Sequence, residues 1–124
     1  MKGLQWPRRC GALLTGLLMV ASISAFGQSS QTVKGEVLDM SCYMGHGAKG
    51  KGHQQCAQKC LDKGLPAGLL TSSGKVYLLV EDHSKAKAYE SAIQHAADQV
   101  QITGKVVNKN GMQALVVEDV KTSS

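Results

Sequence analysis

The chain has 124 residues, a formal net charge of +5, and only one Trp, three Tyr and one Phe. Lys2, Arg8 and Arg9 are the only basic residues among the first 27, and all nine acidic residues follow, so the remainder has 11 basic against nine acidic residues, a net charge of +2. This small charge and the scarcity of aromatic side chains argue against a nucleic-acid partner. A chain of this length can bury one modest core.

Residues 1–27 have the pattern of a signal peptide. A positively charged start precedes an almost wholly apolar run over residues 11–23, and Ala25-Phe26-Gly27 supplies small residues for cleavage after Gly27. The apolar run is shorter than the roughly 20 residues that span a bilayer. We therefore expect an exported protein, periplasmic or secreted, in which residues 28–124 form one domain without an integral membrane segment.

The first half of the expected mature chain contains a strand and a helix. Residues 33–38 alternate apolar and polar side chains with the period of a half-buried strand. The four glycines within residues 39–52 predict an irregular loop without a regular element. Residues 53–63 favour a helix that ends at Gly64, shortly before a proline.

Two hairpins and a second helix follow. Residues 68–71 and 75–81 flank a Ser-Ser-Gly turn, and residues 100–107 and 112–120 flank Asn-Lys-Asn-Gly, so each pair predicts a β-hairpin. Between the hairpins, residues 84–98 place apolar side chains on one helical face, and the serine at the start of this segment is a candidate N-cap.

Five strands with a helix between the third and the fourth have the element order of an OB-like barrel. The predicted fold is therefore mainly β with helices, a small five-stranded OB-like barrel in which the cysteine-bearing helix 53–63 is inserted after the first strand. A different five-stranded α+β sheet is the competing prediction, because element order alone does not define topology.

A histidine and three cysteines form the candidate site. Cys10 leaves with the signal peptide, so the mature chain has an odd number of cysteines, Cys42, Cys56 and Cys60. At about 100° per residue, His53, Cys56 and Cys60 fall within about 60° of one another on a helix. Cys42 directly follows the first strand, and the flexible loop can return it to that stripe.

These four side chains make a Cys₃His ligand set, which suits Zn²⁺. Soft sulfur ligands also suit Cu(I), and Met40, Met44 and His46 lie close enough in sequence to contribute. The two methionines favour copper slightly over zinc.

Three other interpretations of the cysteines remain open. Cys56 and Cys60 can simply be the small buried face of a short helix. A disulfide from Cys42 to either of them would stabilise the domain by about 3 kcal/mol and leave one thiol over. Thiol redox chemistry is the third, although the Cys-x-x-x-Cys spacing departs from Cys-x-x-Cys and no thioredoxin-like pattern surrounds it.

A longer segment, residues 35–79, carries a family resemblance. It has Asp39, Cys42 and Tyr43 after the first strand, then Gly-His-x-x-Cys-Ala-x-x-Cys over residues 52–60 and Gly-x-Pro-x-Gly-Leu-Leu over residues 64–70. In these motifs the chain resembles a largely uncharacterised family of small exported bacterial proteins with an OB-like domain. The resemblance covers about half of the mature chain and implies a periplasmic or secreted setting, but no activity.

No Ser-His-Asp spacing or paired carboxylates suggest catalysis. The sequence therefore predicts an exported binding or carrier module that is not an enzyme and that holds copper or zinc through Cys42, His53, Cys56 and Cys60. One alternative is a disulfide-stapled module that recognises another envelope protein. The other is an accessory thiol redox protein.

Overall fold

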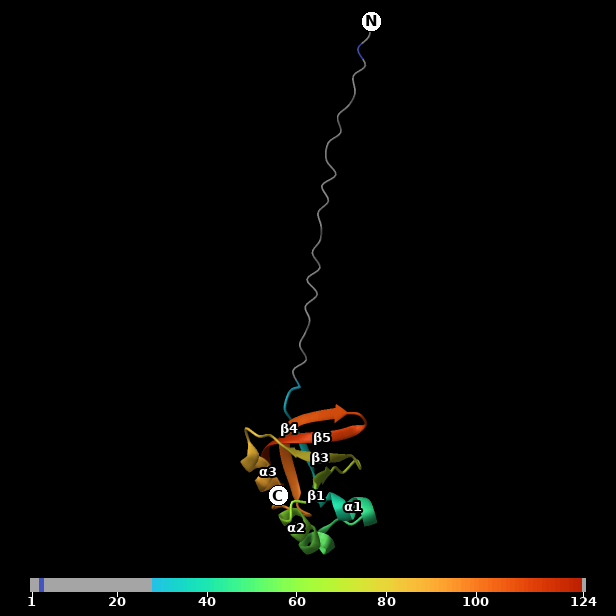
Figure 1. The fold of residues 1–124 in the computed structure, drawn as a ribbon, viewed down its shortest axis with the longest axis vertical. Helices are drawn as coiled ribbons and strands as arrows, with labels where there is room; N and C mark the ends of the chain where they lie inside the picture. Colours follow the sequence, from blue (N-terminus) through green and yellow to red (C-terminus); the bar gives the residue numbers. More distant parts are fainter. Residues whose placement is uncertain (1–2, 4–27, 124) are drawn as a thin grey trace.

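The computed structural model describes residue 3 and residues 28–123, so the predicted signal peptide lies, apart from Gly3, outside the described residues. The described chain is mainly β: a five-stranded mixed sheet closes on itself in a ring, and three α-helices flank it (Figure 1). None of the helices in this part of the chain is long and apolar enough to cross a membrane. The elements are β1 (Gln31–Asp39), α1 (Met40–His46), the 3₁₀ turn η1 (Lys51–His53), α2 (Gln54–Asp62), β2 (Ala67–Leu70), β3 (Val76–Glu81), α3 (Ala86–Ala92), β4 (Gln99–Lys109) and β5 (Met112–Thr122).

The ring follows the strand order β1-β2-β3-β5-β4, and β4 returns to pair with β1. All neighbours are antiparallel except β3 and β5, which run parallel with Leu79 opposite Leu115. A parallel pair needs a crossover connection, and here α3 and β4 lie between the two strands in the chain. β1 pairs with β4 over Gln31–Glu36 and with β2 over Glu36–Asp39, so it joins the two ends of the strand order and closes the ring.

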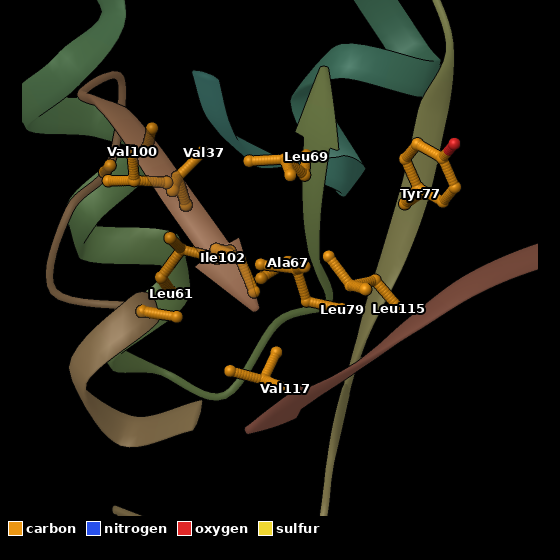
Figure 2. Close-up of a cluster of buried hydrophobic side chains, with 13 residues drawn as sticks. Val37, Leu61, Ala67, Leu69, Tyr77, Leu79, Val100, Ile102, Leu115 and Val117 are labelled. Carbon is orange, nitrogen blue, oxygen red and sulfur yellow. The ribbon is translucent and has the colours of Figure 1, made fainter. Parts of the chain in front are cut away.

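The core fills the inside of the ring. Figure 2 shows side chains from all five strands and from α2 converging there. Leu69, Ile102 and Leu115 are completely buried, and fully burying such a side chain contributes roughly 1.5–3 kcal/mol. Leu61 of α2 is 1% exposed and packs in the same cluster, so the helix that carries two of the cysteines is part of the core.

All five predicted strands are present with bounds within two residues of those expected, and β3 is one residue shorter than expected, but the predicted helix over residues 84–98 is wrong in extent. It is helical only over α3, and Ser84 does not cap it. The backbone N–H and the hydroxyl of Ser84 instead bind Asp82 Oδ1, at 2.9 and 2.7 Å, in the turn before the helix. Helix α3 ends at Ala92, and Ala97, between α3 and β4, has a φ of 61°, a left-handed conformation that a helix continuing to residue 98 would not contain.

The expected irregular loop over residues 39–52 is also wrong, because α1 and part of η1 lie within it. Asp39 is the N-cap of α1, and its side chain accepts hydrogen bonds from the backbone N–H groups of Ser41 and Cys42. Gly47 ends the helix with a φ of 67°, the left-handed conformation that glycine adopts at little cost. The caps at Asp39 and Gly47 therefore stabilise a short helix here in spite of the low helix propensity of glycine.

Candidate metal centre

Helix α1 determines where Cys42 lies. Asp39 is the last residue of β1 and is buried, 2% exposed, so the start of α1 is fixed to the ring. Its carboxylate accepts from Ser41 N at 3.0 Å and from Cys42 N at 3.3 Å. The backbone N–H of Met40 donates to the carbonyl of Pro66 at 2.9 Å, which ties the helix to the segment before β2. Cys42 is thus held one turn beyond a rigid strand end.

Helix α2 positions Cys56 and Cys60. Ala57 and Leu61, which are 3% and 1% exposed, face the core and fix the rotation of the helix about its axis. Cys56 and Cys60 each precede one of these buried residues, so they form an adjacent stripe along the same helix. His53 ends η1 and is the N-cap residue of α2, directly before this stripe. Figure 1 shows α1 and α2 together at one end of the molecule.

Two glutamines fasten α2 to the segment before β4. Gln54 Nε2 donates to the carbonyl of Ala96 at 2.9 Å and to Asp98 Oδ1 at 3.0 Å. Gln58 Nε2 donates to the carbonyl of Ile93 at 2.9 Å, and its Oε1 accepts from Ala96 N at 3.2 Å. These contacts lie on the flank of α2, so they hold the cysteine stripe in place without using the cysteines.

The structure brings five donor side chains into two groups that share Cys42. In the first group, one donor atom each from Cys42, His53 and Cys56 lies within 4.8 Å of the other two. In the second, Asp39, Cys42 and Cys60 meet the same criterion. The Cys and His side chains therefore lie close enough to hold a metal ion, because Zn–S and Zn–N bonds of about 2.3 and 2.0 Å place donors of one tetrahedral ion slightly closer than this.

The histidine of the first group has an unsatisfied nitrogen. His53 Nε2 is buried and has no hydrogen-bond partner among the described residues. A buried polar atom in this state carries a desolvation cost of about 1–3 kcal/mol. Coordination of a cation by the imidazole is one way to remove that cost, and the neighbouring sulfur atoms of Cys42 and Cys56 are typical co-ligands.

Hydrogen bonds within the second group stabilise thiols over thiolates. The hydrogen bond to Asp39, followed by burial, raises the pKa of Cys42 to about 12. Burial, followed by a hydrogen bond to Asp39, raises the pKa of Cys60. For Asp39 itself, burial raises the pKa, but hydrogen bonds from the Cys42 thiol and the backbone of Ser41 and Cys42 outweigh it, and the pKa is lowered. The arrangement is thus an ionised carboxylate that accepts from two thiols.

This electrostatic pattern bears on the chemistry of the cysteines. A thiol with a raised pKa is a weak nucleophile, since the thiolate is the reactive form. Metal binding displaces the thiol proton, so the same raised pKa makes metal affinity depend on pH. The raised pKa values therefore argue against a strongly nucleophilic thiol at Cys42 or Cys60 in the metal-free protein.

The three described cysteines are all free, and the disulfide that the sequence allowed from Cys42 to Cys56 or Cys60 is not formed. The extra ligands considered for copper, Met40, Met44 and His46, all belong to α1. Met44 is 73% exposed, and the sulfur of Met40 packs against Gly68 of β2. His46 is exposed and belongs to neither donor group of the described residues.

Asp39 is the donor that sequence reasoning did not propose as a ligand. The available signal was its position, an acidic residue directly after a buried strand and three residues before a cysteine, which is the spacing of an N-cap and its N3 residue. The predicted loop did not include helix α1, which holds the Cys42 thiol close to the Asp39 carboxylate.

Comparisons with known protein families, with functionally characterised proteins and with solved structures gave no match. The proposed function therefore rests on the geometry of the site and on the sequence patterns.

Proposed function

We propose that this protein is an exported metal-binding or carrier module, not an enzyme, that coordinates Cu(I) or Zn²⁺ through its Cys/His cluster. Cys42, His53 and Cys56 supply the primary ligands, and Cys60, which lies beside Cys42, is a further thiolate within reach. The closed five-stranded ring acts as an OB-like scaffold that holds α1 and α2 together. Its closed strand order and the double pairing of β1 support that assignment.

One observation carries the proposal: the donor atoms of three side chains typical of zinc or copper sites lie within 4.8 Å of one another. Cys42 comes from α1, His53 from the end of η1 and Cys56 from the start of α2. The unpartnered Nε2 of His53 supports the same interpretation. The proposal also includes export, which the pattern of residues 1–27 predicts. It includes membership of the exported family that residues 35–79 resemble.

A metal titration of the reduced protein tests the proposal. We expect the protein, purified after expression of the full chain and freed of metal, to bind Zn²⁺ or Cu(I) in competition with a chromophoric chelator. His53→Ala should weaken binding at least about tenfold, the scale on which lost ligand support lowers metal affinity. His83→Ala is the matched control, because the side chain of His83 is 99% exposed and, within residues 28–123, pairs with Glu81 and belongs to neither donor group.

Equal binding by wild type and His53→Ala, or no competition with the chelator at all, would contradict the proposal. The disulfide-stapled and thiol-redox alternatives differ in thiol content. They predict that protein purified from an oxidising compartment has fewer than three thiols available after chelation, whereas a metal site predicts that chelation releases all three.

A further inference from the structure

The geometry points to a second metal ion, held by Asp39, Cys42 and Cys60, so that the sulfur of Cys42 bridges two divalent zinc-type ions. This inference rests on the proposed function, because it takes the Cys42–His53–Cys56 group as the first site. It extends that site to a dinuclear centre with one shared thiolate.

The first argument is the division of the donors. The five side chains fall into two groups of three, and Cys42 is the member common to both. Each group has donor atoms within 4.8 Å of one another, so each is close enough for its own ion. Cys56 and Cys60 lie four residues apart on α2, about one helical turn. Cys56 belongs to the first group and Cys60 to the second. Two ions side by side, with Cys42 between them, use every donor.

The second argument is the burial of Asp39. It is the one charged residue that is buried within residues 28–123, and none of the ion pairs found there includes it. A buried charge is usually paired with an opposite charge or coordinates a metal. A cation bound by the second group would pair with the Asp39 carboxylate and replace the thiol protons that it faces in the metal-free protein.

The third argument is the charge of the ligand set. Cysteine ligands bind metals as thiolates and carboxylates bind ionised, whereas imidazole binds neutral. Three thiolates and one carboxylate therefore supply four negative charges, which two divalent ions balance and one divalent ion leaves half uncompensated. Two Cu(I) ions would also leave excess negative charge, and a carboxylate oxygen is a poor ligand for Cu(I). The combined set thus favours Zn²⁺ as the class of ion.

Cadmium is a suitable probe, because ¹¹³Cd replaces Zn²⁺ at thiolate sites and its magnetic resonance reports each ion separately. We expect the reduced, metal-free protein to bind two equivalents of cadmium. Two ¹¹³Cd resonances should then appear, with a scalar coupling between them that only a shared ligand transmits. Asp39→Asn should keep the N-cap, because asparagine caps helices equally well. It should weaken the second equivalent at least about tenfold and remove the coupling.

Three variants complete the test. Cys60→Ser should lose the same equivalent as Asp39→Asn, His53→Ala should weaken the other one, and His83→Ala should leave both unchanged. Binding of a single equivalent that Asp39→Asn does not affect would overturn the second ion but leave the proposed function intact. Two uncoupled resonances would overturn the bridge. Binding of no cadmium by the wild type would overturn both proposals.

Discussion

The carboxylate of Asp39 accepts a hydrogen bond from the backbone N–H of Cys42 at 3.3 Å and also from its thiol, so one acidic side chain begins α1 and controls the protonation of the first cysteine. The contact links the end of β1 to the candidate metal centre. It also makes the reactivity of Cys42 a sensitive measure of the local geometry.

Replacing Asp39 with asparagine should make Cys42 more reactive in the metal-free protein. Loss of the anionic acceptor removes the largest cause of the raised pKa, so the pKa of Cys42 should fall from about 12 toward its ordinary value of 9.0. Each unit is a tenfold gain in thiolate at neutral pH, and we expect alkylation by iodoacetamide at pH 8 to accelerate at least about tenfold. Peptide mass spectrometry would locate the label. Asp62→Asn, on α2, is the control and should leave the rate unchanged.

Gln58 should stabilise the fold by fixing α2 to the segment after α3. Gln58→Ala removes the hydrogen bonds to the Ile93 carbonyl and the Ala96 N–H and leaves both part-buried groups without this partner. We expect the free energy of unfolding in urea to decrease by about 1–3 kcal/mol. Gln55→Ala, at an exposed position of the same helix, should change it by less than about 0.5 kcal/mol. Equal effects of the two substitutions would contradict this role of Gln58.

Asp98 should make stability depend on pH in the acid range. The hydrogen bond from Lys51 lowers the pKa of Asp98, burial raises it, and the hydrogen bond from His95 lowers it again, with a net decrease below 3.8. Because the pKa is lower in the folded state, the contribution is present above about pH 4 and is lost as the pH falls through the folded pKa. Asp98→Asn should therefore flatten the thermal stability profile between about pH 5 and 2. Asp119→Asn, at an exposed residue, should leave that slope intact.

Two glycines should respond in opposite ways to alanine. A Cβ at Gly104 would clash with the carbonyl oxygen of Val116 on the neighbouring strand, so we expect Gly104→Ala to destabilise the ring by about 1–3 kcal/mol or more. Gly45 lies within α1 with nothing near its Cβ position, and Gly45→Ala should raise stability by about 0.5–1 kcal/mol. Thermal unfolding followed by circular dichroism measures both. Destabilisation by Gly45→Ala would indicate that the segment is not helical.

Local patterns predicted the strands well because each strand of the ring has one face toward the core. The alternation of Val33, Gly35 and Val37 marks β1, and Asn110-Gly111, both with positive φ, forms the predicted turn between β4 and β5. Local sequence patterns could not predict the parallel pairing of β3 with β5. It joins residues more than 30 positions apart, and nothing in either strand alone encodes it.

The sequence named four of the five residues in the two donor groups, but it did not predict how they are grouped. Helical spacing correctly placed Cys56 and Cys60 on one stripe of α2. It could not reveal that Cys60 groups with Asp39, whereas Cys56 groups with His53. That division depends on where α1 delivers Cys42, and α1 was missed because its glycines were given more weight than its caps at Asp39 and Gly47.

X-ray absorption spectroscopy of the zinc-loaded protein tests the metal centre most directly, because it measures the ligand atoms of the ion itself. Coordination through Cys42, His53 and Cys56 predicts a first shell with sulfur at about 2.3 Å and imidazole nitrogen at about 2.0 Å. It also predicts loss of sulfur scattering in Cys42→Ser. A shell made only of oxygen and nitrogen, unchanged in Cys42→Ser, would contradict the coordination of metal by this cluster.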